Sequence, residues 1–188
     1  MPVLCGVLAV QGSFGLHARV LERCGAAWRE VRTPADLEGL THIIIPGGES
    51  TTMHKLGAHY GLLAPLARAI GNGMAAFGTC AGAILLGDGP PPPPRLGLAP
   101  LIVVRNAYGR QKESFTADVA MPSLGGSFRG IFIRAPKIEL PPAPPPGTEV
   151  LGRCGDAPVM VKYGRMLLAT FHPELTGETR VHRFFLDM

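Results

Sequence analysis

The sequence predicts an α/β fold, an open three-layer sandwich in which helices cover both faces of a mostly parallel central sheet. Two apolar runs, Val3–Val10 and Thr41–Ile45, are continuous enough to be strands that are buried on both faces. A stretch with helical apolar spacing lies between them, and strands that alternate with helices form parallel sheets with right-handed crossovers. The second half of the chain has shorter runs with more polar alternation, which predict an antiparallel extension of the sheet.

Turn and cap residues separate the expected elements of the first half. Apolar positions between Phe14 and Cys24 recur at helical spacing, and Gly25 is suited to end that helix. Thr33 and Pro34 have the residue types of an N-cap and a first helical position. The candidate strands cover residues 3–10, 26–31, 41–45 and 74–77, and the candidate helices cover 14–24, a short segment from 34, one stretch over 53–66, and 81–86.

Proline-rich segments and short strands make up the second half. Pro90–Pro94 cannot be helix or central strand, so we expect a stiff surface connection within the domain. Tyr163-Gly164-Arg165 suits a hairpin turn between two strands. The candidate strands are 101–105, 114–120, 128–134, 149–151, 159–163 and 166–171, and an amphipathic helix is expected within 178–188.

Length, composition and charge narrow the class of protein. The 188 residues, 46% of them hydrophobic, fit a single domain, 1–188, with a sizeable core. The net charge of +4 is spread without a lysine or arginine run, which argues against a nucleic-acid partner. No apolar segment is long enough to span a bilayer, so we expect a cytoplasmic protein with no membrane partner. The four cysteines are far apart and lack metal-ligand spacing, so we expect them to be reduced and expect no metal site. We expect no cofactor.

A G-x-C-x-G pattern, residues 78–82, lies between two apolar runs and centres on Cys80. In α/β enzymes such a pattern holds a nucleophile on a tight turn between a strand and a helix, where small flanking residues avoid a clash. The dipole and free N–H groups of a helix N-terminus favour the reactive thiolate and can hold an oxyanion. The alternative is a buried structural cysteine beside two turn glycines.

The segment Pro46–Thr52 directly follows the third candidate strand, so it lies at the carboxyl edge of the sheet, where open α/β folds bind ligands. Gly47 and Gly48 allow close backbone approach and offer N–H donors, and Glu49 and Ser50 bring polar side chains to the same place. A turn followed by a helix cap would explain the same residues.

The last candidate strand ends at Phe171 and is followed by His172-Pro173-Glu174. A histidine at the carboxyl end of a strand can take the thiol proton of Cys80 and return it to a leaving amine. A carboxylate two residues later can fix the tautomer and orientation of the imidazole. A loop histidine and a solvated surface charge are the alternatives for His172 and Glu174.

Together these motifs resemble the class I, or triad, glutamine amidotransferases. G-T-C-A-G at 78–82 and F-H-P-E at 171–174 carry that resemblance, which implies the flavodoxin-like three-layer fold of the family. The similarity extends from Val7 to Phe185. Four longer blocks are similar to one branch of the family, the glutaminase subunits of pyridoxal 5'-phosphate synthases: P-G-G-E-S-T-T-M at 46–53, R-N-x-x-G-R-Q at 105–111, I-R-A-P at 133–136 and H-P-E-L-T at 172–176.

The resemblance implies a role for each matching residue. Cys80 matches the nucleophile that attacks the carboxamide of L-glutamine, His172 matches the acid/base, and Glu174 matches its orienting partner. The residues whose N–H groups match the oxyanion hole are Gly47, Gly48 and Ala81. The positions that match the family's glutamine-binding residues are Gly48, Glu49, Ser50, Arg105, Ile133 and Arg134.

The resemblance also implies a heteromeric complex. Members of this branch pass ammonia through a tunnel to a pyridoxal 5'-phosphate synthase subunit, a (β/α)8 barrel that is typically needed for activity. Two features depart from the family pattern: Leu16 stands where an acidic residue often precedes the histidine at position 17, and the Pro90–Pro94 run is unusual. The alternatives are a free-standing cysteine hydrolase of related fold, such as a peptidase or γ-glutamyl hydrolase, and a non-catalytic interaction subunit.

Overall fold

The computed structural model describes residues 2–91, 94–105 and 114–188, and the elements below belong to these residues. The strands are β1 Leu4–Leu8, β2 Ala27–Val31, β3 His42–Ile45, β4 Ala75–Thr79, β5 Ile102–Val104, β6 Ser114–Met121, β7 Gly126–Ile133, β8 Lys137–Glu139, β9 Thr148–Cys154, β10 Ala157–Tyr163 and β11 Met166–Ala169. The α-helices are α1 Phe14–Cys24, α2 Ser50–His59, α3 Leu63–Gly71, α4 Ala81–Leu86 and α5 Arg180–Leu186. The 3₁₀ helices are η1 Pro34–Leu37, η2 Pro122–Leu124 and η3 Pro173–Leu175.

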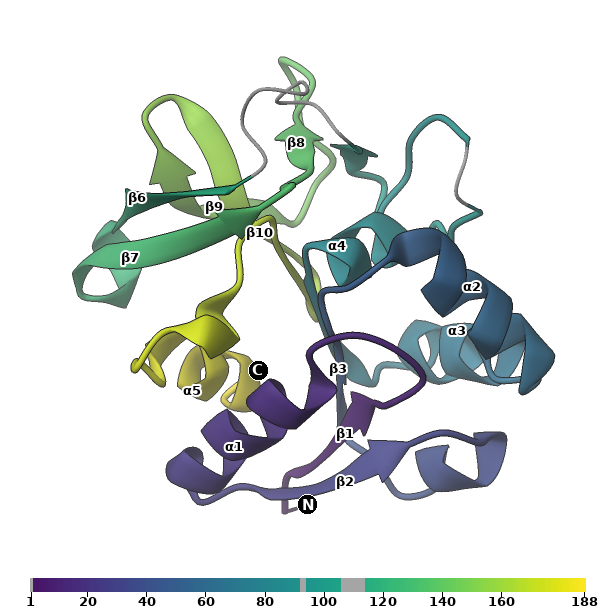
Figure 1. Ribbon diagram of the computed structural model, residues 1–188. Helices are drawn as coiled ribbons and strands as arrows, with labels where there is room; N and C mark the ends of the chain where they lie inside the picture. The colour runs from purple at the N-terminus through teal and green to yellow at the C-terminus, as the bar shows by residue number, and fades with distance from the viewer. Residues whose placement is uncertain (1, 92–93, 106–113) are drawn as a thin grey trace.

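One large sheet organises the described chain (Figure 1). Its strand order is β2-β1-β3-β4-β11-β10-β9-β6-β7. The strands from β2 to β11 in this order run parallel, and the remaining strands continue the sheet antiparallel. The order β2-β1-β3-β4 is that of flavodoxin-like sheets, in which the ligand crevice lies at the carboxyl ends of the strands. The predicted mostly parallel sheet with an antiparallel extension is therefore confirmed.

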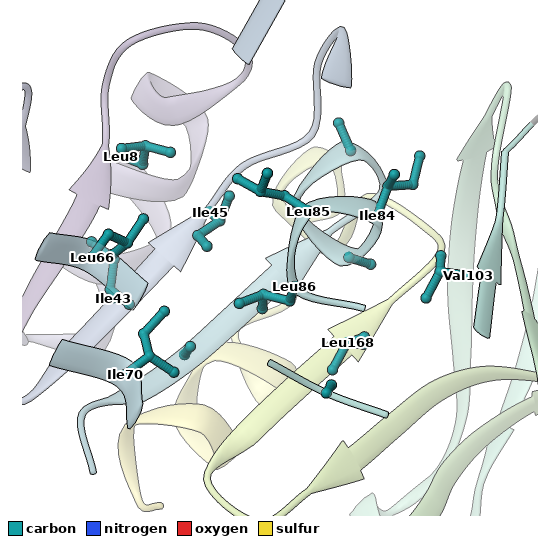
Figure 2. Close-up of a cluster of buried hydrophobic side chains, with 14 of the residues drawn as sticks. Leu8, Ile43, Ile45, Leu66, Ile70, Ile84, Leu85, Leu86, Val103 and Leu168 are labelled. Atoms are coloured by element: carbon teal, nitrogen blue, oxygen red, sulfur yellow. The ribbon is translucent and has the colours of Figure 1, made fainter. Parts of the chain in front are cut away.

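Helices cover both faces of the parallel part and complete the three layers. α1 and α5 lie together on one face, whereas α2, α3 and α4 lie on the other (Figure 1). On the second face, Leu66 and Leu85 belong to an apolar cluster that includes Ile43 and fills the space between helices and sheet (Figure 2). On the first face, the rings of Phe77 and Phe185 lie 5.4 Å apart. The parallel sheet is thus buried on both faces, as its continuous apolar strands predict.

Local stop signals are confirmed where they were expected. Gly25 ends α1 with φ 71° and donates its N–H to the carbonyl of Glu22 at 3.0 Å. Gly164, with φ 55°, lies in the turn that pairs Tyr163 with Met166 in the hairpin of β10 and β11. A positive φ carries no Cβ penalty for glycine, which explains its use at both positions.

Two expectations for the chain's organisation were wrong. The strand near Leu101 does not extend the main sheet: β5 pairs with β8 in a separate two-stranded sheet. Leu101 and Val103 are buried in the same cluster as α4, so this segment covers the helix instead of the sheet edge. The helical stretch 53–66 is two helices, because Gly61 takes φ 63° between α2 and α3.

Parts of two sequence features lie outside the described residues. They are positions 92–93 of the Pro90–Pro94 run and positions 106–111 of the block that begins at Arg105. Among the residues that are described, no helix combines the length and the apolar character needed to cross a membrane.

Candidate active site

Loops from neighbouring strands meet at the carboxyl edge of the parallel sheet. β4 pairs with β3 on one side and with β11 on the other. The Gly47–Gly48 loop follows β3, Cys80 follows β4, and His172 follows β11. Their ends border a pocket of about 250 Å³. The residues that line it are Gln11, Gly48, Glu49, Ser50, Cys80, Ala81, Ile84, Arg105, Ile133, Arg134 and His172.

Cys80 lies on a strained turn at the junction of β4 and α4. Its φ is 47°, which is unusual for a residue with a side chain, and its N–H donates to the carbonyl of Ala169 at 2.8 Å. A Cβ at Gly78 would lie 2.5 Å from the backbone of Gly82, and one at Gly82 would lie 2.0 Å from the carbonyl oxygen of Ile45. The glycines of G-x-C-x-G are therefore required by close backbone packing, as the motif predicts.

His172 is held between Cys80 and Glu174. Its N–H donates to the carbonyl of Ile131 at 2.8 Å, and its Nδ1 lies 2.7 Å from Oε1 of Glu174. Burial of the ring opposes its positive charge. Hydrogen bonds to Cys80 and Glu174 and the negative charges of those groups outweigh burial, however, and raise the pKa of His172 to about 10. His172 is therefore paired with Glu174 and interacts electrostatically with Cys80, the order of a Cys-His-Glu triad.

Glu174 is almost fully buried and stays ionised. Burial alone would raise its pKa, but the adjacent imidazole of His17, the hydrogen bond and charge of His172 and the hydroxyl of Ser13 lower it to about 2. Ser13 donates its hydroxyl to Oε1 at 2.7 Å, the same oxygen that faces His172. Oε2 lies 3.4 Å from Nε2 of His17. A buried carboxylate with these partners suits the orienting position behind a histidine.

The Gly47–Gly48 loop fits closely between two side chains. A Cβ at Gly47 would lie 2.3 Å from Cε1 of His172, and one at Gly48 would lie 2.3 Å from Oε1 of Gln11. Gly48 lies on the pocket wall with Ala81, the first residue of α4. Gly47 does not line the pocket; its carbonyl accepts the N–H of Ser13 at 3.0 Å. Both predicted glycines thus allow an approach that any side chain would block.

Glu49 and Arg105 form an ion pair at the pocket wall. A guanidinium nitrogen of Arg105 lies 3.1 Å from Oε1 of Glu49, and another donates to the hydroxyl of Thr51 at 3.3 Å. Glu49 also caps α2 by accepting the N–H groups of Thr51 and Thr52. Burial opposes the charge of Glu49, but the hydrogen bonds from Thr52 and Thr51 lower its pKa to about 2. Ser50, the first residue of α2, is buried beside this pair.

The antiparallel extension supplies the opposite wall. Ile133 ends β7, and its carbonyl accepts the thiol hydrogen of Cys80 at 3.7 Å between heavy atoms. Arg134 follows with φ 42°, a second positive φ at a residue that is not glycine. The structure therefore brings the site residues that the sequence singled out together around one pocket, except Gly47 and Glu174, which do not line it and instead contact residues behind its wall.

Sequence reasoning missed several residues around this pocket. Gln11 lines it and accepts the N–H of Glu49 at 3.0 Å, and Ser13 and His17 contact Glu174. From the sequence, residues 11–13 were expected only to end the first strand. Because it follows a parallel strand directly, the sheet-edge argument applied to Pro46–Thr52 would have found Gln11 and Ser13.

Comparison with known proteins identifies the family. Residues 7–188 match the SNO glutamine amidotransferase family. The chain is 50% identical to pyridoxal 5'-phosphate synthase subunit PdxT of Pelotomaculum thermopropionicum, over 97% of this chain and 93% of that protein. It is also 50% identical to a PdxT subunit of Thermus thermophilus, over 97% of this chain and 96% of that protein.

Solved structures agree with this relationship. A crystal structure of a glutamine amidotransferase superposes with a TM-score of 0.89 at 48% identity, covering 97% of each chain. PurLQS from Thermotoga maritima, at 17% identity and a TM-score of 0.67, shares the fold over 99% of this chain and 98% of its own. The chain belongs to the SNO glutamine amidotransferase family.

Proposed function

We propose that this chain hydrolyses L-glutamine to L-glutamate and ammonia, and that it delivers the ammonia to the synthase subunit of a pyridoxal 5'-phosphate synthase. The observation that carries the first part is the contiguous chain of Cys80, His172 and Glu174 at the pocket. Its support is the distance of 2.7 Å between His172 and Glu174 and the position of His172 and Cys80 on the wall of the same pocket, where Cys80 helps to raise the pKa of His172. The full-length similarity to PdxT subunits supports the second part.

The triad divides the chemistry into two steps. Nδ1 of His172 is engaged by Glu174, so Nε2 is the nitrogen that exchanges a proton with Cys80, and the pKa of about 10 means that the ring holds this proton at neutral pH while Cys80 is the thiolate. The thiolate attacks the carboxamide carbon of glutamine, and His172 returns the proton to the leaving nitrogen, which departs as ammonia. Water then attacks the γ-glutamyl thioester with His172 as base, which frees glutamate and restores Cys80.

Backbone N–H groups stabilise the negative oxygen that forms in both steps. Ala81 begins α4 directly after Cys80, and Gly48 lies on the same pocket wall. We assign the oxyanion hole to the N–H groups of Ala81 and of the Gly47–Gly48 loop. Preorganised donors of this kind contribute about 2.7–4 kcal/mol each to the transition state.

The remaining wall recognises the amino-acid end of glutamine. Arg105 and Glu49 offer opposite charges to a zwitterionic ligand, and Gly48, Ser50, Ile133 and Arg134 complete the binding site. The volume of about 250 Å³ lies below the range of about 300–1,000 Å³ typical of sites for drug-sized ligands. A single amino acid fits within this volume. No cofactor enters the proposed reaction.

We further propose that residues 1–188 act as one domain, in the cytoplasm, and that the partner is a (β/α)8 barrel. The four cysteines are free, which suits a reducing compartment. The test is glutamate release from glutamine by the chain alone and with the barrel subunit, with Cys80→Ala as control. Release that needs the partner and is lost in Cys80→Ala supports the proposal. Equal release without the partner favours the free-standing hydrolase, and release that survives Cys80→Ala refutes both.

A further inference from the structure

A buried polar cluster extends behind the triad, away from the pocket. His17 of α1 and His182 of α5 are both fully buried, and the two helices pack side by side (Figure 1). Nδ1 of His17 lies 2.9 Å from Nε2 of His182, and Nε2 of His17 lies 3.2 Å from the hydroxyl of Thr79. The cluster therefore connects α5 to the residue that precedes Cys80.

The cluster reaches the one oxygen of Glu174 that the triad does not use. Oε1 of Glu174 takes the hydrogen bonds of His172 and Ser13. Oε2 is buried, and none of the described residues makes a standard hydrogen bond to it. Nε2 of His17 lies 3.4 Å from this oxygen. A buried carboxylate oxygen without a hydrogen-bond donor costs free energy. Nε2 of His17 is therefore the candidate donor for Oε2 of Glu174.

The tautomers of the two histidines follow from their burial and their contacts. Burial lowers the pKa of both rings, that of His182 to about 3, so both rings are neutral near pH 7. If His17 carries its proton on Nε2, facing Thr79 and Glu174, then its Nδ1 accepts from Nε2–H of His182. Nδ1 of His182 is then bare, in agreement with its lack of a hydrogen-bond partner among the described residues.

We propose that His17 is a positioning residue of the proposed reaction: its Nε2–H, kept in that tautomer by His182, steadies Oε2 of Glu174 and so fixes the orientation of His172. A donor at Oε2 keeps the carboxylate from turning or taking up a proton. His172 then stays aligned between Cys80 and Oε1. The effect of His17 on catalysis rests on the proposed function. The effect of His17 on the orientation of Glu174 and His172 does not.

The test compares two substitutions of equal length. His17→Gln keeps an N–H donor near the position of Nε2, whereas His17→Met removes it. The readout is the rate at which iodoacetamide alkylates Cys80 at pH 7, followed by peptide mass spectrometry, which needs neither glutamine nor the synthase subunit. We expect His17→Met to slow alkylation by about tenfold, as for loss of an outer-shell partner elsewhere, and His17→Gln to recover most of the rate.

A double-mutant cycle separates positioning from a structural effect. In Glu174→Gln an amide NH₂ can occupy the place of Oε2, and this group needs no hydrogen-bond donor. In that background we therefore expect His17→Met to change the alkylation rate of Cys80 by less than about twofold. His42→Leu is the matched control: His42 is another buried histidine, but it lies at the start of β3, at the opposite end of the sheet from the triad, and we expect it to leave the alkylation rate unchanged.

The outcomes are distinct. An equal loss of rate in both Glu174 backgrounds, or no recovery with His17→Gln, would overturn the proposal. If His17→Met does not fold, His17→Leu replaces it in the same comparison with His17→Gln. Failure of the proposed function has another signature: wild type with the synthase subunit would release no glutamate from glutamine, while the alkylation pattern would remain.

Discussion

Gly47 controls the position of His172, and Gly47→Ala tests that control. The new Cβ would lie 2.3 Å from Cε1 of His172, whereas ordinary contact begins at 3.4 Å, so the ring must retreat by about 1 Å. A displacement of about 1 Å at a reacting group can cost about 100-fold in rate, or about 2.7 kcal/mol. We therefore expect kcat for glutamine hydrolysis to fall by about 100-fold. KM should change little, because Gly47 does not line the pocket.

The assay is glutamate release in the presence of the synthase subunit, over a range of glutamine concentrations. Gly71→Ala is the matched control, because a Cβ there meets nothing within 4 Å and should leave kcat unchanged. The melting temperature of both variants shows whether a loss of activity reflects unfolding. A Gly47→Ala enzyme with the kcat of wild type would refute the reasoning, since the ring of His172 could then shift without a loss of catalytic rate.

Three further predictions concern the pocket wall, pH and the core. Arg105→Ala removes a charged partner for the carboxylate of glutamine, worth about 1.5–3 kcal/mol, so KM should rise by about tenfold or more; an unchanged KM in steady-state assays would contradict this. The pKa of His172 is raised from 6.5 to about 10, so its stabilising contribution is complete below pH 6.5 and is lost as pH rises to 10. Urea unfolding of wild type and His172→Gln should therefore show a difference that shrinks over this range, and a constant difference would argue against the ion pair. Phe77→Ala should lower the free energy of unfolding by about 3–5 kcal/mol in urea titrations, because the ring is fully buried against Phe185; a loss below about 1 kcal/mol would be inconsistent with that packing.

The parallel half of the fold could be predicted because its signals are local. Continuous apolar strands and the stop at Gly25 each depend on neighbouring residues. Cys80 and His172 could be identified from the sequence for the same reason, since each follows an expected strand. Topology then brings them together, because β4 and β11 are neighbours although 92 positions separate the two residues. The chemistry at this edge could thus be expected without a structure.

The rest depends on contacts that no local pattern carries. β5 alternates like a strand of the main sheet, yet burial of Val103 against α4 gives it a different partner. His17 has the spacing of a core position in α1, and the spacing correctly predicts its burial. Its polar partners lie 62 residues away at Thr79 and 165 residues away at His182. Periodicity identifies the face of a helix, but it does not identify what that face meets.

The antiparallel extension takes part in the candidate site and does more than enlarge the sheet. Strand β7 accepts the N–H of His172 at the carbonyl of Ile131, and two residues later Ile133 accepts the thiol of Cys80. Among the described residues, the positive φ values outside glycine are those of Cys80 and Arg134, which face the same pocket from the two halves of the fold. Backbone strain persists where surrounding structure enforces it. The parallel strands hold Cys80 through its N–H bond to Ala169, and β7 accepts bonds from Cys80 and His172, so these two bonds join the antiparallel extension to the triad and help to fix where the thiol lies.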